Sequence, residues 1–428
     1  MHGSPPRRRL GRALAAGLAA SLLTAQVAHA AEPEADDGRT LGTTVDGLLA
    51  VARRLSPELA AGALDAEVAA ARAAAAGALD DPMLRVTSDE DRDEHGRRLN
   101  KMVYGVEQEF PLWGKRGLRQ RVAEAEADVA RARARAINLD LDERIKVAFA
   151  RYYRAAQALR VERDVHDLLH AVGQAAQARH AQGLGGQSDA IRAGIERSRL
   201  ALEQADLERD RREAEARLNA LAARPVGAAL AAPEVLRPLP TADALRLSDL
   251  LERARRGSPP LAAAEADITA AEGGRQLVER SWYPDISLGA SAIQREAGPA
   301  GYMLTAGLRV PLQWGLRRAQ AREASARLGA ARARQDGALL GLRADLEAAL
   351  ATLEAARRAE ALLTSELAPQ ATAAYRSALA AYQLGRGDLA PVLEAAHQSQ
   401  AVRLDLLAVQ EREQTALAGL ERLVGGEL

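Results

Sequence analysis

The sequence predicts a mainly α-helical protein with a smaller β portion, in which one unit of short helix, β-hairpin, long helix and returning helix occurs twice. Aromatic residues make up only 3% of the 428 residues, a composition typical of long helices rather than of large packed cores. A strand-like run, a proline, a Trp-Gly pair and a long helix-forming stretch follow one another at 101–121 and again at 302–322. Because landmarks such as Pro111 and Pro311 recur at offsets near 200 residues, we infer an internal duplication.

Residues 1–30 have the pattern of a secretory signal peptide. Arginines cluster at 7–12, an apolar run follows at 14–27, and Ala28-His29-Ala30 forms a small-x-small cleavage site. The alternative is an N-terminal membrane anchor. No other run reaches the ~18 apolar residues of a membrane helix, so we expect the mature chain to enter a membrane only through β-strands.

Charge and composition exclude several classes of function. Basic and acidic residues number 58 each, so no electrostatic field favours nucleic-acid binding. The chain has no cysteine, which excludes disulfides, thiolate metal sites and a cysteine nucleophile. We find no G-x-S-x-G, H-E-x-x-H or P-loop motif. We therefore predict neither enzymatic activity nor a cofactor.

The first unit is expected to span residues 31–240. Ser56 and Pro57 resemble an N-cap followed by proline at the first helical position. The hairpin at 83–110 shows period-2 alternation, with Met102, Tyr104 and Val106 on one face. The other elements are expected as helices at 45–55, 58–79, 114–182 and 188–224, a helix-reversing tip at 183–186 and a proline-rich linker at 225–240.

The second unit, residues 241–428, is expected to follow the same order. A helix at 241–256 precedes a hairpin at 285–310 and a long helix at 315–384. Pro369 has no counterpart in the first half and should kink this long helix. A tip at Gly385-Arg386-Gly387 then leads to a final helix at 388–423.

Each predicted strand has about the 9–11 residues of a transmembrane β-strand. Four strands cannot close a barrel, and lipid does not tolerate open sheet edges. Several copies of the chain would therefore have to share one barrel. Two copies would give eight strands, and three would give twelve with an open lumen.

The joints and the tip resemble those of the TolC family of outer membrane efflux proteins. The resemblance rests on Glu107-Gln108-Glu109-Phe110-Pro111 with Gly114-Lys115-Arg116, Tyr283-Pro284, Val310-Pro311-Leu312 with Trp314-Gly315, and Tyr382-Gln383-Leu384-Gly385-Arg386-Gly387. It covers nearly all of residues 40–425. The first joint resembles the heavy-metal and cation efflux branch most.

This resemblance implies a homotrimer with a twelve-stranded β-barrel in the outer membrane, four strands per chain, continued by an α-helical barrel in the periplasm. It also implies a periplasmic adaptor and an inner-membrane pump of the RND type as partners. The implied function is the exit duct of a tripartite efflux system, conducting substrates passively, with heavy-metal cations as one cargo. Drug efflux or type I protein secretion are alternatives within the family, and a periplasmic coiled-coil adaptor without a barrel is a further alternative.

The helix tips are the first candidate site. By the resemblance, Gly183, Leu184, Gly185, Leu384, Gly385, Arg386 and Gly387 form the periplasmic mouth that meets the adaptor. Glycine also suits a helix reversal because such turns need positive φ, so tight turns alone would explain these residues. Asp189 and Asp388, with Arg386, are candidates for a gate at the mouth. Helix N-capping is the simpler role for both aspartates.

Two further groups of residues are candidates. His166 and His170 lie four residues apart on one helix face, a spacing that can hold a metal. No third ligand lies nearby in the sequence, so we expect a solvated or lumen-facing pair and no metal site. Joints between strand and helix are expected at Pro111, Trp113 and Gly114, and at Pro311, Trp314 and Gly315. We expect both tryptophans to pack at the bend rather than to form an interfacial aromatic girdle.

Overall fold

A computed structural model describes residues 41–92, 98–181, 186–295 and 301–428. The chain divides into two units, Met1–Asp37 and Gly38–Leu428, and the fold below is that of the second unit. The predicted signal peptide and the predicted tip residues Gly183, Leu184 and Gly185 lie outside the described residues.

The first half of this unit contains four helices and two strands among the described residues. In chain order they are α1 Val45–Leu55, α2 Pro57–Ala76, β1 Met83–Arg92, β2 Arg98–Phe110, α3 Lys115–Ala181 and α4 Gln187–Leu221. Ser56 is the N-cap of α2, as predicted, and its hydroxyl accepts a hydrogen bond from the Leu59 amide at 3.4 Å. Pro57 occupies the first helical position, where its missing N–H has no intrahelical partner to lose.

The second half follows the same order with two differences. Its elements are η1 Ala242–Leu245, α5 Leu247–Gly257, α6 Pro259–Arg280, β3 Asp285–Arg295, β4 Gly301–Arg309, α7 Trp314–Leu362, η2 Leu363–Leu367, α8 Ala368–Gln383 and α9 Leu389–Val424. The helix expected at 241–256 begins as a short 3₁₀ turn, η1. The single helix expected at 315–384 is divided by a π-helical turn, η2.

Pro369 accounts for the division of the second long helix. It lies in the first turn of α8, directly after the π-helical turn. Proline has no N–H to donate and its ring clashes with the preceding turn, so the regular hydrogen-bond ladder cannot continue through this position. The sequence predicted a kink here, and the structure shows a change of helix type just before the proline.

The four strands form one antiparallel sheet in the order β1-β2-β3-β4. The β2–β3 pair joins the two halves of the chain, with Gly105 opposite Ser291. Cross-strand partners share a face of a sheet, so the register collects apolar residues on one side: Leu84, Val86, Tyr104, Val106, Ala290, Ala292, Tyr302 and Leu304. Tyr302 and Leu304 are each 87% exposed.

The opposite face of the sheet carries its charged and hydroxyl side chains, and by register it also contains Val103, Ile293 and Met303. Arg85 pairs with Glu107 at 3.5 Å, and Arg309 forms an ion pair with Glu109. Ser287 and Ser291 lie on the same face by register. The alternation predicted for the strands is therefore present in the sheet, with one lipid-compatible face and one face that carries these ion pairs.

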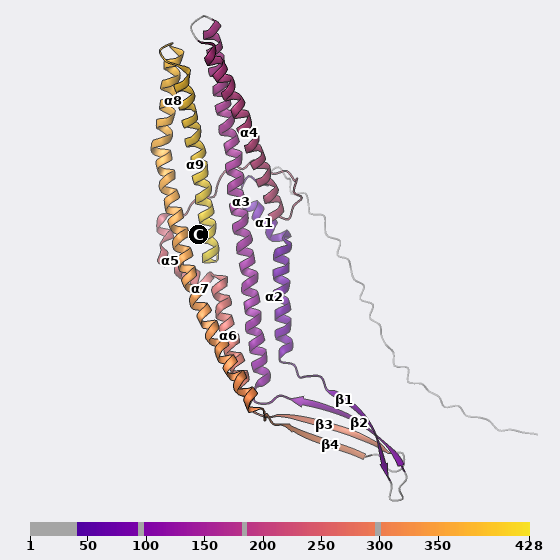
Figure 1. The fold of residues 1–428 in the computed structure, drawn as a ribbon. Coiled ribbons are helices and arrows are strands. Elements are labelled where there is room, and N and C mark those ends of the chain that lie inside the picture. Colours follow the sequence, from indigo (N-terminus) through magenta and orange to yellow (C-terminus); the bar gives the residue numbers. More distant parts are fainter. Residues whose placement is uncertain (1–40, 93–97, 182–185, 296–300) are drawn as a thin grey trace, which may run out of the picture. The chain divides into compact units, whose positions relative to one another are not determined.

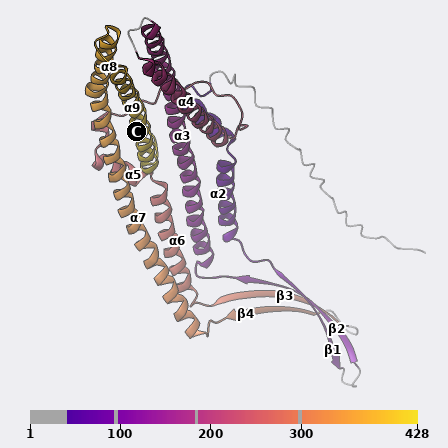
Figure 2. The ribbon, with the colours of Figure 1, turned by 45° about the horizontal axis from the view of Figure 1, so that its top comes forward.

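The helices form a layer in which neighbours pack side by side (Figures 1 and 2). Near the sheet the order is α2, α3, α6, α7, and toward the helix tips it is α4, α3, α9, α8. The first half thus contacts the second through α3, which packs against both α6 and α9. Within the described ranges, no helix combines the length and the apolar character required to cross a membrane.

The apolar stripes predicted for the long helices form the core of this layer. Ile145, Phe149 and Tyr152 of α3 are buried in one cluster with α1, and Leu346 and Leu353 of α7 are buried in another. A third cluster near the tips joins α3 to α9. It contains Val161, Val165, Leu169, Val172, Tyr382, Leu389, Val392 and Leu393.

A buried ion network connects α3, α9 and linker 225–240. The Lys146 ammonium lies 2.8 Å from the Glu421 carboxylate, and both side chains are almost fully buried. Arg237 of the linker donates to both oxygens of the same carboxylate at 2.9 Å. Removing one member of such a network leaves an unpaired buried charge, so the network fixes where the linker crosses the helices.

Candidate functional site

The joint between β2 and α3 is a tight turn with two residues at positive φ. Trp113 has φ 61° and Gly114 has φ 75°. A tryptophan in this region is strained, and its contacts hold it there. The indole Nε1 donates to the Pro284 carbonyl at 2.9 Å, and its ring centroid lies 5.2 Å from that of Tyr283. Trp113 therefore packs at the bend, against the second half of the chain.

Lys115 is the charged centre of the same joint. Its ammonium donates to the Tyr283 carbonyl at 2.8 Å and to the two Asp285 carboxylate oxygens at 2.9 and 2.8 Å. The Asp285 carboxylate also accepts from the Leu112 amide at 2.9 Å. Because Lys115 is buried, these contacts tie the start of α3 to the start of β3.

The second joint repeats the sequence but not this geometry. Trp314 is the first residue of α7, and its ring meets that of Trp282 edge-on at 6.4 Å between centroids. Gly315 lies inside the helix, where an added Cβ would meet nothing within 4 Å. After Pro311 the chain enters its helix without a positive-φ pair, so Gly114 is required by the backbone and Gly315 is not.

The α8–α9 tip is a Schellman motif. Gly385 has φ 73°, its amide donates to the Tyr382 carbonyl at 3.1 Å, and the Arg386 amide donates to the Ala381 carbonyl at 2.9 Å. These two bonds satisfy carbonyls that the end of α8 leaves unpaired. Leu384 beside the turn is 70% exposed. The turn therefore presents an apolar side chain to solvent from a fixed backbone.

Arg179 of α3 connects this tip to the first half of the chain. Its guanidinium donates to the Tyr382 carbonyl at 2.5 Å and lies 4.6 Å from the centre of the Tyr382 ring. Tyr382 is buried, and burial, helped by the charge of Asp189, raises the pKa of its phenol against the opposing effect of Arg179. The family motif in the sequence pointed to Tyr382, but nothing in it indicated Arg179.

The candidate gate residues are not joined in the structure. Asp388 occupies the N-cap position of α9, although its side chain makes no capping bond. Asp189 was expected to be an N-cap, and this expectation was wrong. Helix α4 begins at Gln187, and the Asp189 amide already bonds the Gly186 carbonyl at 3.2 Å. No ion pair links Arg386 to either aspartate within the part of the chain that the structure describes.

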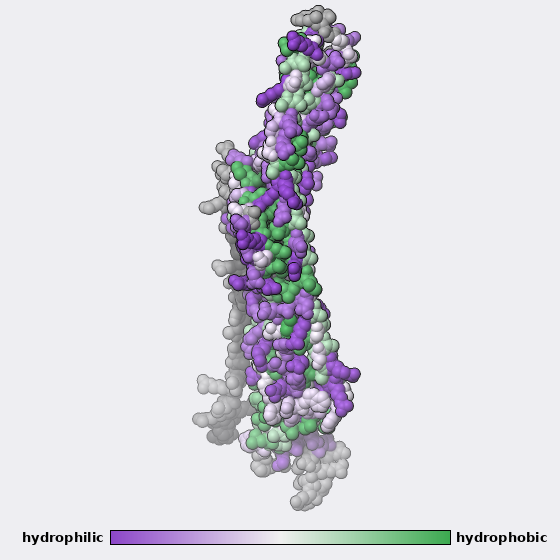
Figure 3. Space-filling model, turned by 90° about the vertical axis from the view of Figure 1, so that its left-hand side faces the viewer, coloured by the Kyte–Doolittle hydropathy of each residue, from purple (hydrophilic) through white to green (hydrophobic). Residues whose placement is uncertain are grey.

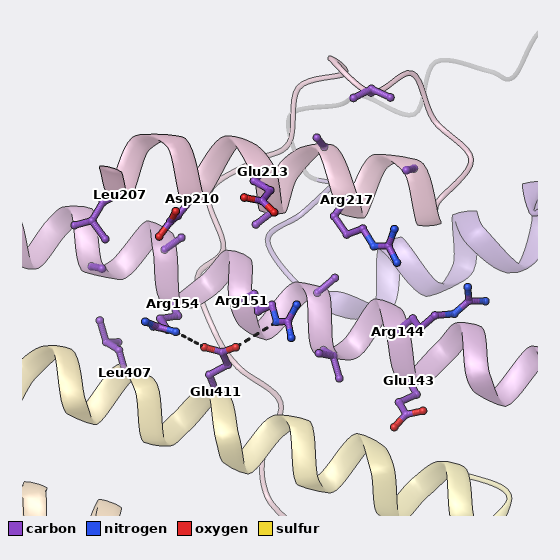
Figure 4. A pocket seen from close by; sticks show the side chains of 18 of the residues that line it. Glu143, Arg144, Arg151, Arg154, Leu207, Asp210, Glu213, Arg217, Leu407 and Glu411 are labelled. Carbon is purple, nitrogen blue, oxygen red and sulfur yellow. Dashed lines mark hydrogen bonds and ion pairs between the residues drawn. The ribbon is translucent and has the colours of Figure 1, made fainter. Parts of the chain in front are cut away.

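A groove of about 1100 Å³ lies between α3, α4 and α9. Figure 4 shows Arg151 and Arg154 of α3 directed toward Glu411 of α9, with N–O distances of 3.4 and 2.8 Å, while Asp210 and Arg217 come from α4. Charges of both signs alternate along its walls. Ion pairs across the groove connect α3 to α9. The mixed lining gives no cluster of like charges that would attract a small ion.

His166 and His170 form a partly exposed pair on α3. Their rings are stacked with centroids 6.4 Å apart, and Nδ1 of His166 lies 3.5 Å from Asp167. Among the described residues, no three side chains of the metal-binding types are grouped to hold an ion. Within the described ranges, the neighbouring helices therefore do not add a ligand group to this histidine pair.

Sequence reasoning missed the buried carboxyl groups, of which Glu162 and Glu413 are the least exposed among the described residues. Glu162 of α3 is 2% exposed and accepts from Gln400 at 2.8 Å. Burial, together with the charge of Glu203, raises its pKa. Glu413 of α9 is also 2% exposed. A carboxylate within a helix's apolar stripe is the signal that could have revealed both, since charged residues are rarely buried without a partner.

Comparisons with known proteins agree with this architecture. The model of the family described as outer membrane efflux protein matches residues 48–224 and again 250–426. The sequence matches none of the curated proteins. Similar solved structures include the outer membrane protein VceC from Vibrio cholerae, with TM-score 0.76, 20% identity, and 90% of this chain and 96% of that chain covered.

Two further structures share the fold. The MtrE outer membrane channel of Neisseria gonorrhoeae, in its open state, has TM-score 0.75 and 19% identity over 90% of this chain and 89% of that chain. CusC has TM-score 0.76 and 16% identity over 91% and 94%. These likenesses confirm the predicted fold class, and the double family match covers most of the sequence. The chain therefore belongs to the outer membrane efflux protein family and is an outer membrane channel rather than an enzyme.

Proposed function

We propose that three copies of this chain assemble into the exit duct of a tripartite efflux system. A periplasmic adaptor and an inner-membrane pump of the RND type would open the duct and supply the energy, and cargo would pass through it passively. Channels of this family are trimers that work with periplasmic adaptors and inner-membrane pumps, which supports the proposal.

The main support for the proposal is that the sheet and the layer of helices each have two unpaired edges. Strands β1 and β4 each pair on one side only within the described residues. Helix α4 ends one side of the layer near the tips and α7 and α8 end the other. Repetition of the same chain would pair β4 with β1 and α8 with α4 of the next copy, which closes both layers at once.

The two helical edges carry the apolar side chains that such contacts need. On α4, Ile191, Ile195 and Leu202 are more than half exposed along one stripe. On the other edge, Leu340 of α7 is 71% exposed and Leu362 is also exposed. Figure 3 views the side on which α7 and α8 lie in Figure 1, and it shows a lengthwise band of apolar surface. Exposed apolar stripes of this kind mark protein contacts.

The tips are the proposed periplasmic mouth. Leu384, Gly385, Arg386 and Gly387 would meet the adaptor, together with the predicted tip residues Gly183, Leu184 and Gly185. The gate between subunits would consist of Asp189, Arg386 and Asp388, because these residues form no ion pair within the described part of one chain. Heavy-metal cations are the proposed cargo, supported by the resemblance of residues 107–116 to that efflux branch.

The test uses a strain from which the gene is deleted. Wild-type protein should restore resistance to zinc, cobalt or copper salts, and heat-modifiable migration should show a trimer in the outer-membrane fraction. Leu384→Glu should abolish resistance without loss of trimer, because the side chain is exposed and the fold does not need it. Val235→Glu, at a similarly exposed position in the linker, is the control and should retain resistance.

The outcomes separate the parts of the proposal. A monomer in the periplasmic fraction would contradict the duct. A trimer that restores resistance to drugs but not to metals would contradict the cargo alone. Normal efflux by Leu384→Glu would remove the role of the tip.

A further inference from the structure

The second long helix contains a hinge that the first lacks. Helix α3 runs without a break from Lys115 to Ala181, whereas α7 ends in the π-helical turn η2 and Pro369 follows at once. A π-turn next to a proline lacks regular backbone hydrogen bonds and is a point where helices bend. The segment beyond this hinge, α8, carries the tip around Gly385.

A pair of carboxyl groups lies just before the hinge, between α7 and α9. Glu360 of α7 accepts a hydrogen bond from the Gln410 amide of α9 at 3.0 Å. Glu413 lies one turn from Gln410 on the same face of α9 and is 2% exposed. Its Oε1 atom has no hydrogen-bond partner among the described residues. Ala356, Leu363 and Val409 are buried together in the same seam.

The charges around Glu413 favour its protonated form. Burial is the largest effect that raises the pKa of Glu413. The negative charge of Glu360 and a hydrogen bond with Glu360 raise it further, to about 7, while the positive charge of Arg357 lowers it. Arg357 also donates to the Pro240 carbonyl. From linker 225–240, Arg237 is paired with Glu421. Glu413 is buried and Glu360 is half-buried, and two neighbouring carboxyl groups in such a site do not both ionise easily.

We propose that Glu413 and Glu360 form a proton-operated latch on the hinge of the second long helix. In the closed latch, the protonated Glu413 carboxyl donates its O–H to the Glu360 carboxylate and holds α7 against α9. When the proton leaves to water, two negative charges face each other, α7 separates from α9 at this level, and α8 turns at η2. The inference rests on the proposed duct, since it regulates the mouth that α8 carries.

The direction of the pH effect follows from the raised pKa. The folded chain keeps the Glu413 proton up to about pH 7, whereas an unfolded chain releases it at the ordinary carboxyl value. The stabilisation from the latch is therefore complete below that ordinary value and is lost as the pH rises through about 7. The latch is closed in mild acid and open in mild base.

The absence of cysteine allows two spin labels to be placed without background. Ser377→Cys lies above the hinge on α8 and Thr415→Cys lies below it on α9, and both positions are exposed. Distances between the labels are measured in the full-length protein from about pH 5 to about pH 9. We expect one transition with its midpoint near pH 7.

Substitutions assign the transition to the latch. Glu413→Gln, whose amide can still donate to Glu360, should keep the low-pH distance throughout. Glu360→Gln removes the like charge and should move the midpoint to lower pH. Glu394→Gln is the matched control, because Glu394 is an exposed glutamate on the same helix, and it should behave as the wild type.

Two results would overturn the latch: a label distance that does not depend on pH, or a Glu413→Gln protein whose transition matches the wild type. The oligomeric state of the same proteins separates this failure from that of the duct. A trimer in the outer-membrane fraction with a constant label distance rejects the latch alone. A monomer in the periplasmic fraction rejects the duct, while the label distances still test the latch.

Discussion

Lys115 shows how much of the joint depends on one side chain. It is buried, and it satisfies the Asp285 carboxylate and the Tyr283 carbonyl together. Asp285 in turn fixes the Leu112 amide at the turn that holds Trp113 at positive φ. The strained tryptophan is therefore supported by an ion pair between residues that are distant in the sequence.

Lys115→Met should destabilise the protein strongly. The substitution leaves the Asp285 carboxylate without its cation, and breaking a buried pair in this way costs about 3–5 kcal/mol. The measurement is the denaturant midpoint of the purified protein in detergent. Lys115→Met/Asp285→Asn should recover part of the loss, because no unpaired charge remains and the Asn oxygen can still accept from Leu112. Equal midpoints for Lys115→Met and the wild type would contradict this account.

The hairpin of α8 and α9 depends on its connecting turn. Gly385→Ala should destabilise it by about 1 kcal/mol, since φ 73° is unfavourable for a residue with a Cβ. Gly387→Ala is the control, because Gly387 is not at positive φ and an added Cβ would meet Ala381 at 3.4 Å. Hydrogen exchange of the amides in α8 measures the difference. Equal exchange in the two variants would show that the turn does not need glycine.

Elements were predictable where local pattern decides structure. Periodicity and capping predict the strand at Asn100 to Phe110, the N-cap at Ser56 and the buried stripe at Ile145, Phe149 and Tyr152. The structure contains all of them. The Asp189 N-cap was wrong because helix α4 begins earlier, at Gln187.

The contacts that define the candidate site were not predictable in the same way. These contacts join residues that are distant in the sequence and that only the folded chain brings together. They are Arg179 with Tyr382, Lys115 with Asp285, and Glu413 with Glu360. The two joints share a Trp-Gly sequence but differ in backbone conformation. Gly114 is in a left-handed turn and Gly315 is inside a helix, although both follow a tryptophan.

At the scale of the whole molecule, the exposed stripe on α4 should be a contact between subunits. Ile195→Glu places a charge in the middle of that stripe, so it should reduce the trimer fraction while the monomer keeps its helices. Size-exclusion chromatography with light scattering and circular dichroism measure the two quantities. Arg197→Glu, an exposed position on the same helix outside the stripe, is the control. An unchanged trimer fraction for Ile195→Glu would exclude α4 as an interface.

The central pairing of β2 with β3 also sets the order in which the chain folds. Gly105 and Ser291 are direct partners, so the middle of the sheet cannot form until the intervening residues have been synthesised and have brought the two hairpins together. Closing so long a loop is slow compared with forming the neighbouring contacts of α3 and α4. We therefore expect helical hairpins to form first and the sheet last, so that the lipid-compatible face is completed only in a chain whose periplasmic part is already folded.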